Sequence, residues 1–213
     1  MRLGWIVVVG LSACGPASPQ IEAPKSVPSS APPPAPASPP GALALVLDRS
    51  GSMTGAKMEA ARNAAHAIVD RLRDDDELAV IAFDSSAKLF VPIARVADRP
   101  MIHAQIDSIQ PAGGTEFTQA LKLATDELSL AGPKSRHVLF MTDGMAPTEG
   151  VDACVAALNA IGATLSTIGL GESTDPVLLG RMASLGGGRT WTVVAPHELP
   201  EAFRADLGAF LHR

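Results

Sequence analysis

Five oxygen-bearing side chains stand at three separate points of this 213-residue sequence. Asp48, Ser50 and Ser52 follow a continuous apolar run over residues 42–47, in a D-x-S-x-S pattern. Thr115 comes directly after a Gly-Gly pair, and Asp143 follows a second apolar run. Two carboxylates and three hydroxyls offer only oxygen, the donor atom that a hard divalent cation such as Mg²⁺ prefers. No Cys or His stands beside these residues, which argues against zinc.

These five groups need a scaffold that brings them together. Apolar runs predict buried strands at residues 42–47, 77–83, 136–141 and 164–170, with shorter strands at 88–91 and 190–194. Amphipathic patterns predict helices at 58–72, 98–109, 117–130, 151–161, 175–185 and 199–211. Strands that alternate with helices indicate a doubly wound α/β fold: a mostly parallel, six-stranded sheet with helices on both faces.

The fold class predicts where the five groups meet. Ligands of doubly wound sheets bind beyond the carboxyl ends of the strands, at the point where the strand order reverses. With the order 3-2-1-4-5-6, Asp48 and Asp143 end adjacent central strands at that point. The neighbouring glycines would let the loops approach an ion closely.

Asp48, Ser50, Ser52, Thr115 and Asp143 also match, in type and in order, the metal-ion-dependent adhesion site of von Willebrand factor type A domains. The sequence resembles this family over residues 42–211. The resemblance implies that Ser50 and Ser52 bind Mg²⁺ or Mn²⁺ directly and that Asp48 and Asp143 bind it largely through water. It also implies that Thr115 enters or leaves the coordination shell. The ion would then bridge to an acidic side chain of a partner protein that the sequence does not identify.

Two residues depart from the commonest family pattern. Arg49, between the first two ligands, brings a positive charge near the rim, either as a solvent-exposed filler or to steer an acidic ligand. Glu116 follows Thr115 and is expected to cap the next helix. Met53 and Met145, each beside a predicted metal loop, are either core residues or part of a contact surface.

Other function classes find less support in the sequence. A phosphohydrolase of the haloacid dehalogenase type needs a second Asp where this chain has Ser50. Ser85 and Lys88 form a Ser-x-x-Lys pattern without its partner motifs, and His66 lies within a predicted helix without a catalytic neighbour in sequence. We therefore expect no enzyme activity. A structural or regulatory lipoprotein without metal-dependent adhesion is the alternative, and a hydrolase is a weaker one.

The N-terminus indicates export and lipid attachment. Met1-Arg2 and the apolar segment 3–11 form a signal peptide that is too short to span a membrane, and Leu11-Ser12-Ala13-Cys14 resembles a bacterial lipobox. The predicted domains are a lipoprotein signal at 1–14 that ends in the acylated Cys14, a Pro-rich disordered linker at 15–40, and a folded domain at 41–213. The expected location is the cell envelope, anchored to a membrane by lipid, more in keeping with the outer membrane than the inner.

Composition excludes two further classes. The net charge is -5 and no cluster of Lys and Arg marks a nucleic-acid surface, so we expect no nucleic-acid partner. The chain has only two cysteines, Cys14 and Cys154, which rules out a disulfide scaffold. Cys154 lies in a helical apolar segment and is expected to be a buried small residue.

Overall fold

The computed structural model describes residues 39–133 and 135–211. Its centre is one six-stranded sheet with the strand order β3-β2-β1-β4-β5-β6, in which only β3 runs antiparallel to its neighbour. The strands are β1 (Gly41–Asp48), β2 (Glu77–Phe83), β3 (Ala87–Arg95), β4 (Ser135–Thr142), β5 (Ala163–Leu170) and β6 (Gly187–Val193). The predicted fold class and strand order are confirmed.

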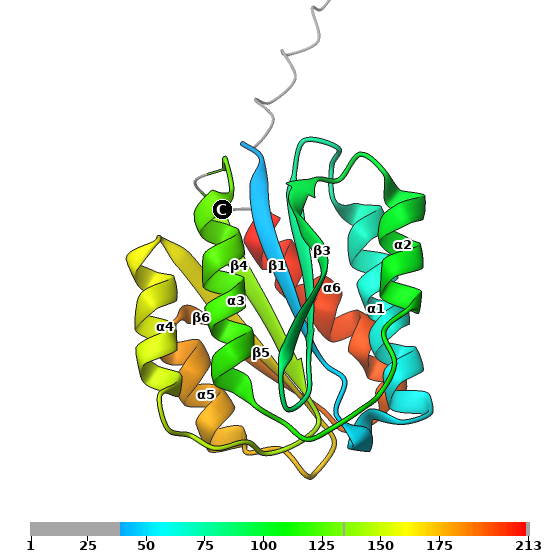
Figure 1. Cartoon of the computed structure of the whole chain (residues 1–213), viewed down its shortest axis with the longest axis vertical. Helices are drawn as coiled ribbons and strands as arrows, with labels where there is room; N and C mark the ends of the chain where they lie inside the picture. The colour runs from blue at the N-terminus through cyan, green and yellow to red at the C-terminus, as the bar shows by residue number, and fades with distance from the viewer. Residues whose placement is uncertain (1–38, 134, 212–213) are drawn as a thin grey trace, which may run out of the picture. The chain divides into compact units, whose positions relative to one another are not determined.

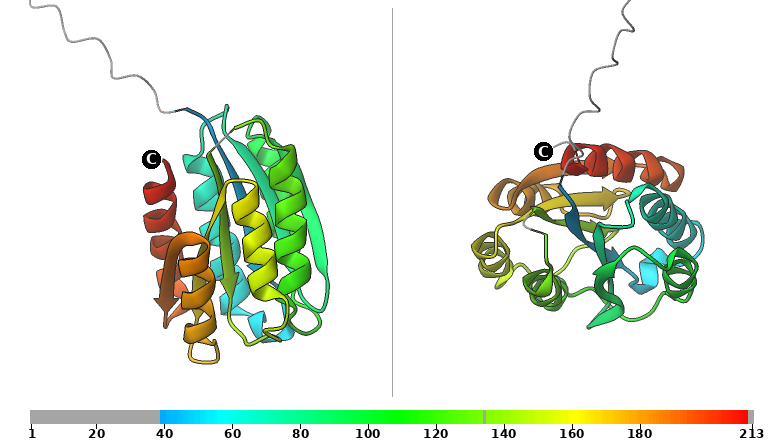
Figure 2. Two further views of the ribbon diagram at one scale, coloured as in Figure 1. Left: turned by 90° about the vertical axis from the view of Figure 1, so that its left-hand side faces the viewer. Right: turned by 90° about the horizontal axis from the view of Figure 1, so that it is seen from above.

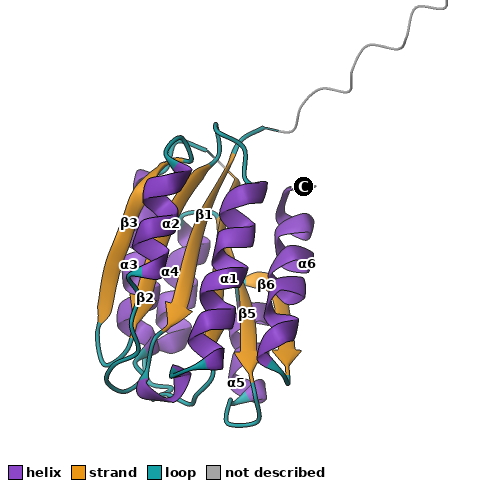
Figure 3. Ribbon diagram, turned by 90° about the vertical axis from the view of Figure 1, so that its right-hand side faces the viewer, coloured by secondary structure: helices purple, strands orange, loops and turns teal. Residues whose placement is uncertain are grey.

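Helices cover both faces of the sheet (Figures 1 and 2). They are α1 (Ala56–Arg71), α2 (Arg99–Asp107), α3 (Phe117–Leu130), α4 (Val151–Ala160), α5 (Pro176–Leu185) and α6 (Leu199–Leu211), with short 3-10 turns η1 (Gly51–Met53) and η2 (Pro196–Glu198). Helices α1, α2 and α6 pack on one face, and α3, α4 and α5 pack on the other. Figure 3 shows the parallel strands running toward a common edge.

The central strand β1 is buried along its whole length. Because side chains alternate along a strand, successive residues enter opposite cores. Leu43, Leu45 and Leu47 join the core beneath α1, α2 and α6, whereas Ala42, Ala44 and Val46 join the core beneath α3, α4 and α5. This two-sided burial explains why the sequence shows a continuous apolar run and not an alternating pattern.

Two strands differ from the prediction in their bounds. Strand β3 continues to Arg95, four residues beyond the expected end, and contains Pro92. Pro92 is tolerated because β3 is an edge strand, where a missing N–H need not break the ladder. Strand β6 begins at Gly187, three residues before the expected Thr190, because its first residues are glycines that carry no strand signal.

A surface contact ties α1 to α2. The Nδ1 atoms of His66 and His103 lie 2.6 Å apart, and their Nε2 atoms contact Asp107 at 2.9 Å and Asp70 at 3.1 Å, respectively. His66 is therefore a partly exposed residue in a chain of four polar side chains between two helices.

The N-terminal predictions fall outside the described residues. The signal segment, Cys14 and the Pro-rich linker up to residue 38 all belong to that part. In the part of the chain that is described, no helix is long and apolar enough to cross a membrane.

Candidate metal centre

The predicted site residues meet at the carboxyl edge of the sheet, the lower edge in Figure 1. Three loops converge there and are joined by backbone hydrogen bonds. The loop after β1 accepts Ala112 N–H at Arg49 O (2.7 Å) and donates Gly51 N–H to Gly113 O (3.1 Å). The loop after β2 accepts Glu116 N–H at Asp84 O (2.8 Å). These bonds fix the segment that carries Thr115 against the D-x-S-x-S loop.

Asp48 lies at the end of β1 and is fully buried. Its Oδ1 accepts the backbone N–H of Ser50 at 2.7 Å, and its Oδ2 accepts the hydroxyl of Thr142 at 2.5 Å. Burial raises the pKa of Asp48, and the nearby charge of Asp143 acts in the same direction, although the hydrogen bonds from Ser50 and Thr142 oppose them. The carboxylate is therefore held rigidly, in surroundings that favour a nearby positive charge.

Asp143 lies one residue beyond β4 and is also fully buried. Its Oδ1 accepts the hydroxyl of Ser52 at 2.7 Å, and its Oδ2 lies 2.6 Å from the Lys57 ammonium. The Ser52 hydroxyl lies 3.1 Å from that of Ser50. Both serines and both carboxylates are thus brought into one connected group, as predicted.

Thr115 lies in the loop before α3, beside the loop that carries Asp143. It does not cap helix α3, because Glu116 is the N-cap residue and its carboxylate accepts the N–H of Thr118 at 2.9 Å. The cap predicted for Glu116 is confirmed. A methyl group built on Gly144 would lie 3.6 Å from Thr115 Oγ1, so the Thr115 hydroxyl faces the loop that carries Asp143.

The donor set suits a hard divalent cation. Mg²⁺ binds oxygen at 2.0–2.1 Å with octahedral geometry, so neighbouring ligand atoms are about 3 Å apart. The 3.1 Å between the hydroxyls of Ser50 and Ser52 is close to that spacing. Within residues 39–133 and 135–211 no group of three or more His, Cys, Asp or Glu is arranged to hold a metal. A metal at this edge would therefore depend on the hydroxyls.

The structure shows the positions of Arg49, Met53 and Met145, for each of which the sequence allowed two roles. The Arg49 guanidinium forms an ion pair with Asp84 and donates to Gln110 O at 3.2 Å, so its charge is engaged within the protein and it is not an exposed filler. Met53 is a core residue, whereas Met145 is 69% exposed at the same edge.

Sequence reasoning missed the partners of the two carboxylates. Thr142 directly precedes Asp143 in the sequence, but its contact with Asp48 joins neighbouring strands and has no local signal. Lys57 is the second residue of α1, which follows the D-x-S-x-S loop after only a few residues. Its short distance from that loop in the sequence is the signal that could have indicated it.

The Ser-x-x-Lys pattern is not assembled as a catalytic pair. Ser85 Oγ accepts the N–H of Gly114 at 2.8 Å, and the Lys88 ammonium lies over the ring of Phe90, 4.8 Å from its centre. Each side chain therefore has a structural partner of its own.

These features define a class: a doubly wound α/β domain with a hydroxyl and carboxylate cluster at its topological switch point. A family model, the von Willebrand factor type A domain, matches residues 42–205, and the chain belongs to that family. Domains of this family typically bind other proteins through a divalent cation at a metal-ion-dependent adhesion site.

One curated relative resembles the chain over most of its length. The chain is 33% identical over 168 residues to an uncharacterized protein, sll0103, of Synechocystis sp.. The matched region covers 76% of this chain and 40% of the Synechocystis protein. The chain thus spans less than half of that relative.

Solved structures show the same fold. A von Willebrand factor type A protein from Catenulispora acidiphila has a TM-score of 0.76 at 23% identity, covering 81% of this chain and 43% of that one. Proximal thread matrix protein 1 of the mussel byssus, in a structure whose adhesion motif is occupied by zinc, has a TM-score of 0.74 at 21% identity. That match covers 82% of this chain and 46% of the mussel protein.

Proposed function

We propose that this domain binds a partner protein through a divalent cation held by Asp48, Ser50, Ser52, Thr115 and Asp143. The observation that carries the proposal is the pair of serine hydroxyls, 3.1 Å apart, with a buried carboxylate bonded to each serine. Mg²⁺ or Mn²⁺ is the proposed ion. When bound, the ion supplies an electrophilic centre for an anionic ligand, and the protein groups hold and orient it.

The charges near the site favour an acidic partner group. A divalent ion balances the formal charges of Asp48 and Asp143, and the nearby Lys57 then leaves one positive charge in excess. Arg49 adds little to this balance because Asp84 is paired with it. A carboxylate from a partner would neutralise the excess, which supports an acidic side chain as the recognised group.

Metal titration tests the proposal. Calorimetric titration of Mg²⁺ and Mn²⁺ into the full chain in mild detergent should show binding at one site. Asp48→Asn and Asp143→Asn, which keep the side-chain shape but remove a ligand charge, should each weaken binding by about a hundredfold or more. Unfolding should be followed in parallel, so that loss of the fold is not mistaken for loss of the site.

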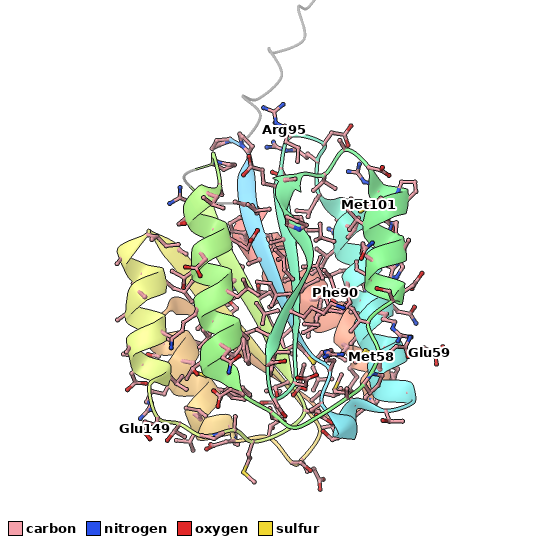
Figure 4. The ribbon with its side chains drawn as sticks, viewed as in Figure 1. Met58, Glu59, Phe90, Arg95, Met101 and Glu149 are labelled. Carbon is pink, nitrogen blue, oxygen red and sulfur yellow. The ribbon has the colours of Figure 1, made fainter. Side chains whose placement is uncertain are left out.

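Glu149→Gln is the matched control. Glu149 is an exposed carboxylate at the same edge of the molecule (Figure 4), and its loss should leave binding unchanged. Equal binding by the wild type and both aspartate variants would refute the proposed ligand set. Zn²⁺ belongs in the same series, because zinc occupies the adhesion motif of the mussel protein.

We also propose that the chain is a lipid-anchored cell-envelope protein, held through acylated Cys14 and more in keeping with the outer membrane, and that it is a binding protein and not an enzyme. Support comes from the lipobox-like segment at residues 11–14 and from the Pro-rich stretch that follows it. The separate structural partners of Ser85 and Lys88 support the absence of a Ser-Lys catalytic pair.

A further inference from the structure

We propose that Lys57 is a built-in cation that competes with the divalent ion for Asp143 and thereby lowers the affinity of the site. This inference rests on the proposed metal-binding function and concerns how that site is regulated. It predicts that the ion binds weakly alone and more tightly together with an anionic partner group.

The position of Lys57 carries the first step. It is the second residue of α1, and its ammonium lies 2.6 Å from Asp143 Oδ2. The Asp143 side chain is fully buried, whereas that of Lys57 is 32% exposed. A lysine is a compact charge on a flexible stem, so the ammonium can move into solvent while the carboxylate stays in place.

The charges around the site indicate that Lys57 stabilises the domain when no metal ion is bound. Asp48 and Asp143 are both fully buried, and buried carboxylates without a positive partner are strongly destabilising. Arg49 is already engaged with Asp84 and Gln110 O. Among the described residues, Lys57 is the cation that pairs with Asp143.

The geometry places this cation where it opposes a metal ion. Asp143 is bonded through Oδ1 to Ser52, whose hydroxyl is one of the two proposed direct ligands. An ion beside Ser52 and an ammonium on Asp143 Oδ2 would share one carboxylate, and their like charges would repel over a few ångströms of partly buried space. Either the ammonium swings out or the ion binds weakly. A partner carboxylate that neutralises the excess positive charge would therefore favour ion binding.

Titration of Lys57 variants tests the inference. Lys57→Met keeps the apolar stem and removes the charge, so the affinity for Mg²⁺ alone should rise by about tenfold or more over the wild type. In EDTA the same variant should unfold at a lower temperature than the wild type, because the buried Asp143 carboxylate has lost its cation. Saturating Mg²⁺ should then raise the midpoint more in Lys57→Met than in the wild type.

Two further variants complete the design. Lys57→Arg keeps the charge and should keep an affinity near that of the wild type. Arg95→Met makes the same change of charge at an exposed position on the opposite edge of the domain (Figure 4) and should change neither the affinity nor the midpoint. If Lys57→Met does not fold, Lys57→Gln replaces it with a polar side chain and the same expectation.

The outcomes separate this inference from the proposed function. Tighter Mg²⁺ binding by Lys57→Met, with wild-type affinity in Lys57→Arg, supports competition. Unchanged or weaker binding by Lys57→Met overturns it, and weaker binding would mean that Lys57 orients Asp143 for the ion. An absence of metal binding in the wild type and in every variant would overturn both the proposed function and this inference.

Discussion

Asp206 on α6 is a carboxylate that is 2% exposed and lies among donors from three strands. Its Oδ2 contacts His137 Nε2 at 2.8 Å, and its Oδ1 accepts the Trp191 indole N–H at 3.3 Å. Burial alone would raise the pKa of Asp206, but the hydrogen bond and charge of His137, with hydrogen bonds from Ser166 and Trp191, hold it below its ordinary value. Asp206 thus fastens the closing helix to the sheet in its ionised form.

Asp206→Asn should destabilise the domain by about 1–3 kcal/mol at neutral pH, because it leaves buried donors poorly paired. A lowered folded-state pKa contributes stability above the unfolded value of about 3.9, and that contribution is lost as the pH falls through the folded value. The difference between wild type and variant in denaturant unfolding should therefore shrink as the pH is lowered from about 5 toward 2.

The comparison of the wild type with Asp206→Asn separates the effect of Asp206 on stability from that of the candidate metal-site residues. The raised pKa of Asp48 acts in the opposite sense, since its protonation is easier in the folded state. Asp126→Asn, at an exposed position on α3, should match the wild type throughout. A difference between wild type and Asp206→Asn that stays constant down to the lowest pH would contradict the assignment.

At the residue scale, the sequence predicted types and order better than pairings. The five proposed ligands follow from motif spacing, and the structure brings them to one edge. The contacts of Asp48 with Thr142, of Asp143 with Lys57 and of Asp206 with His137 join residues separated by 94, 86 and 69 positions. The first and third pairings depend on which strands and helices become neighbours, so no local pattern encodes them. For the second, the closeness of Lys57 to the D-x-S-x-S loop in the sequence is a signal.

At the element scale, a group of three aromatic rings packs behind the loops that carry the candidate metal site. Phe140 on β4 lies 5.0 Å from the ring of Phe83 at the end of β2 and 4.9 Å from that of Phe117 at the start of α3. All three are almost fully buried. Because each ring belongs to an element that ends or begins beside a site loop, their packing fixes the separation of the loops.

The junction of β5 with β6 depends on close backbone approach. A methyl group on Gly188 would overlap the carbonyl of Leu165, and one on Gly186 would lie 2.5 Å from Leu165 Cβ. Gly187, between them, has a φ of +66°, which other residues rarely adopt. The glycine run therefore allows β6 to pair with β5 directly after α5.

Gly188→Ala should lower the thermal midpoint markedly, because the last strand must move away from β5 to make room. Gly180→Ala is the matched control: Gly180 lies inside α5 with open space around it, so the substitution should be neutral or stabilise by up to about 1 kcal/mol. Equal midpoints for the two variants would show that the β5–β6 contact tolerates a side chain.

Elements were predictable where burial is two-sided or amphipathic. Strands β1, β2, β4 and β5 and all six α-helices lie close to their expected positions, because long periodic patterns report them directly. The errors fall at the two edge strands. There, Pro92 and the glycine run have no strand propensity of their own, and they lie in strands because of the tertiary packing.

At the scale of the whole molecule, membrane attachment through Cys14 is a separate prediction. Cys14→Ser should move the protein from the membrane fraction to the soluble fraction, because the acyl chains supply the anchoring energy. Mass spectrometry of the mature wild type should find an acylated Cys14 at its N-terminus. Cys154→Ser, which alters a buried free cysteine in α4, should leave the fractionation unchanged. Retention of Cys14→Ser in the membrane fraction would contradict the anchor.

Strand β1 joins the two ends of the domain. The chain enters it at Gly41, and seven residues later it reaches Asp48 at the carboxyl edge of the sheet. A partner held at the ion and a lipid held at Cys14 would therefore pull on opposite ends of one strand. Most of that tension would run through the covalent backbone of β1. The share that enters through Asp143 would cross the hydrogen bonds between β1 and β4 in shear, with no strand peeled from the sheet.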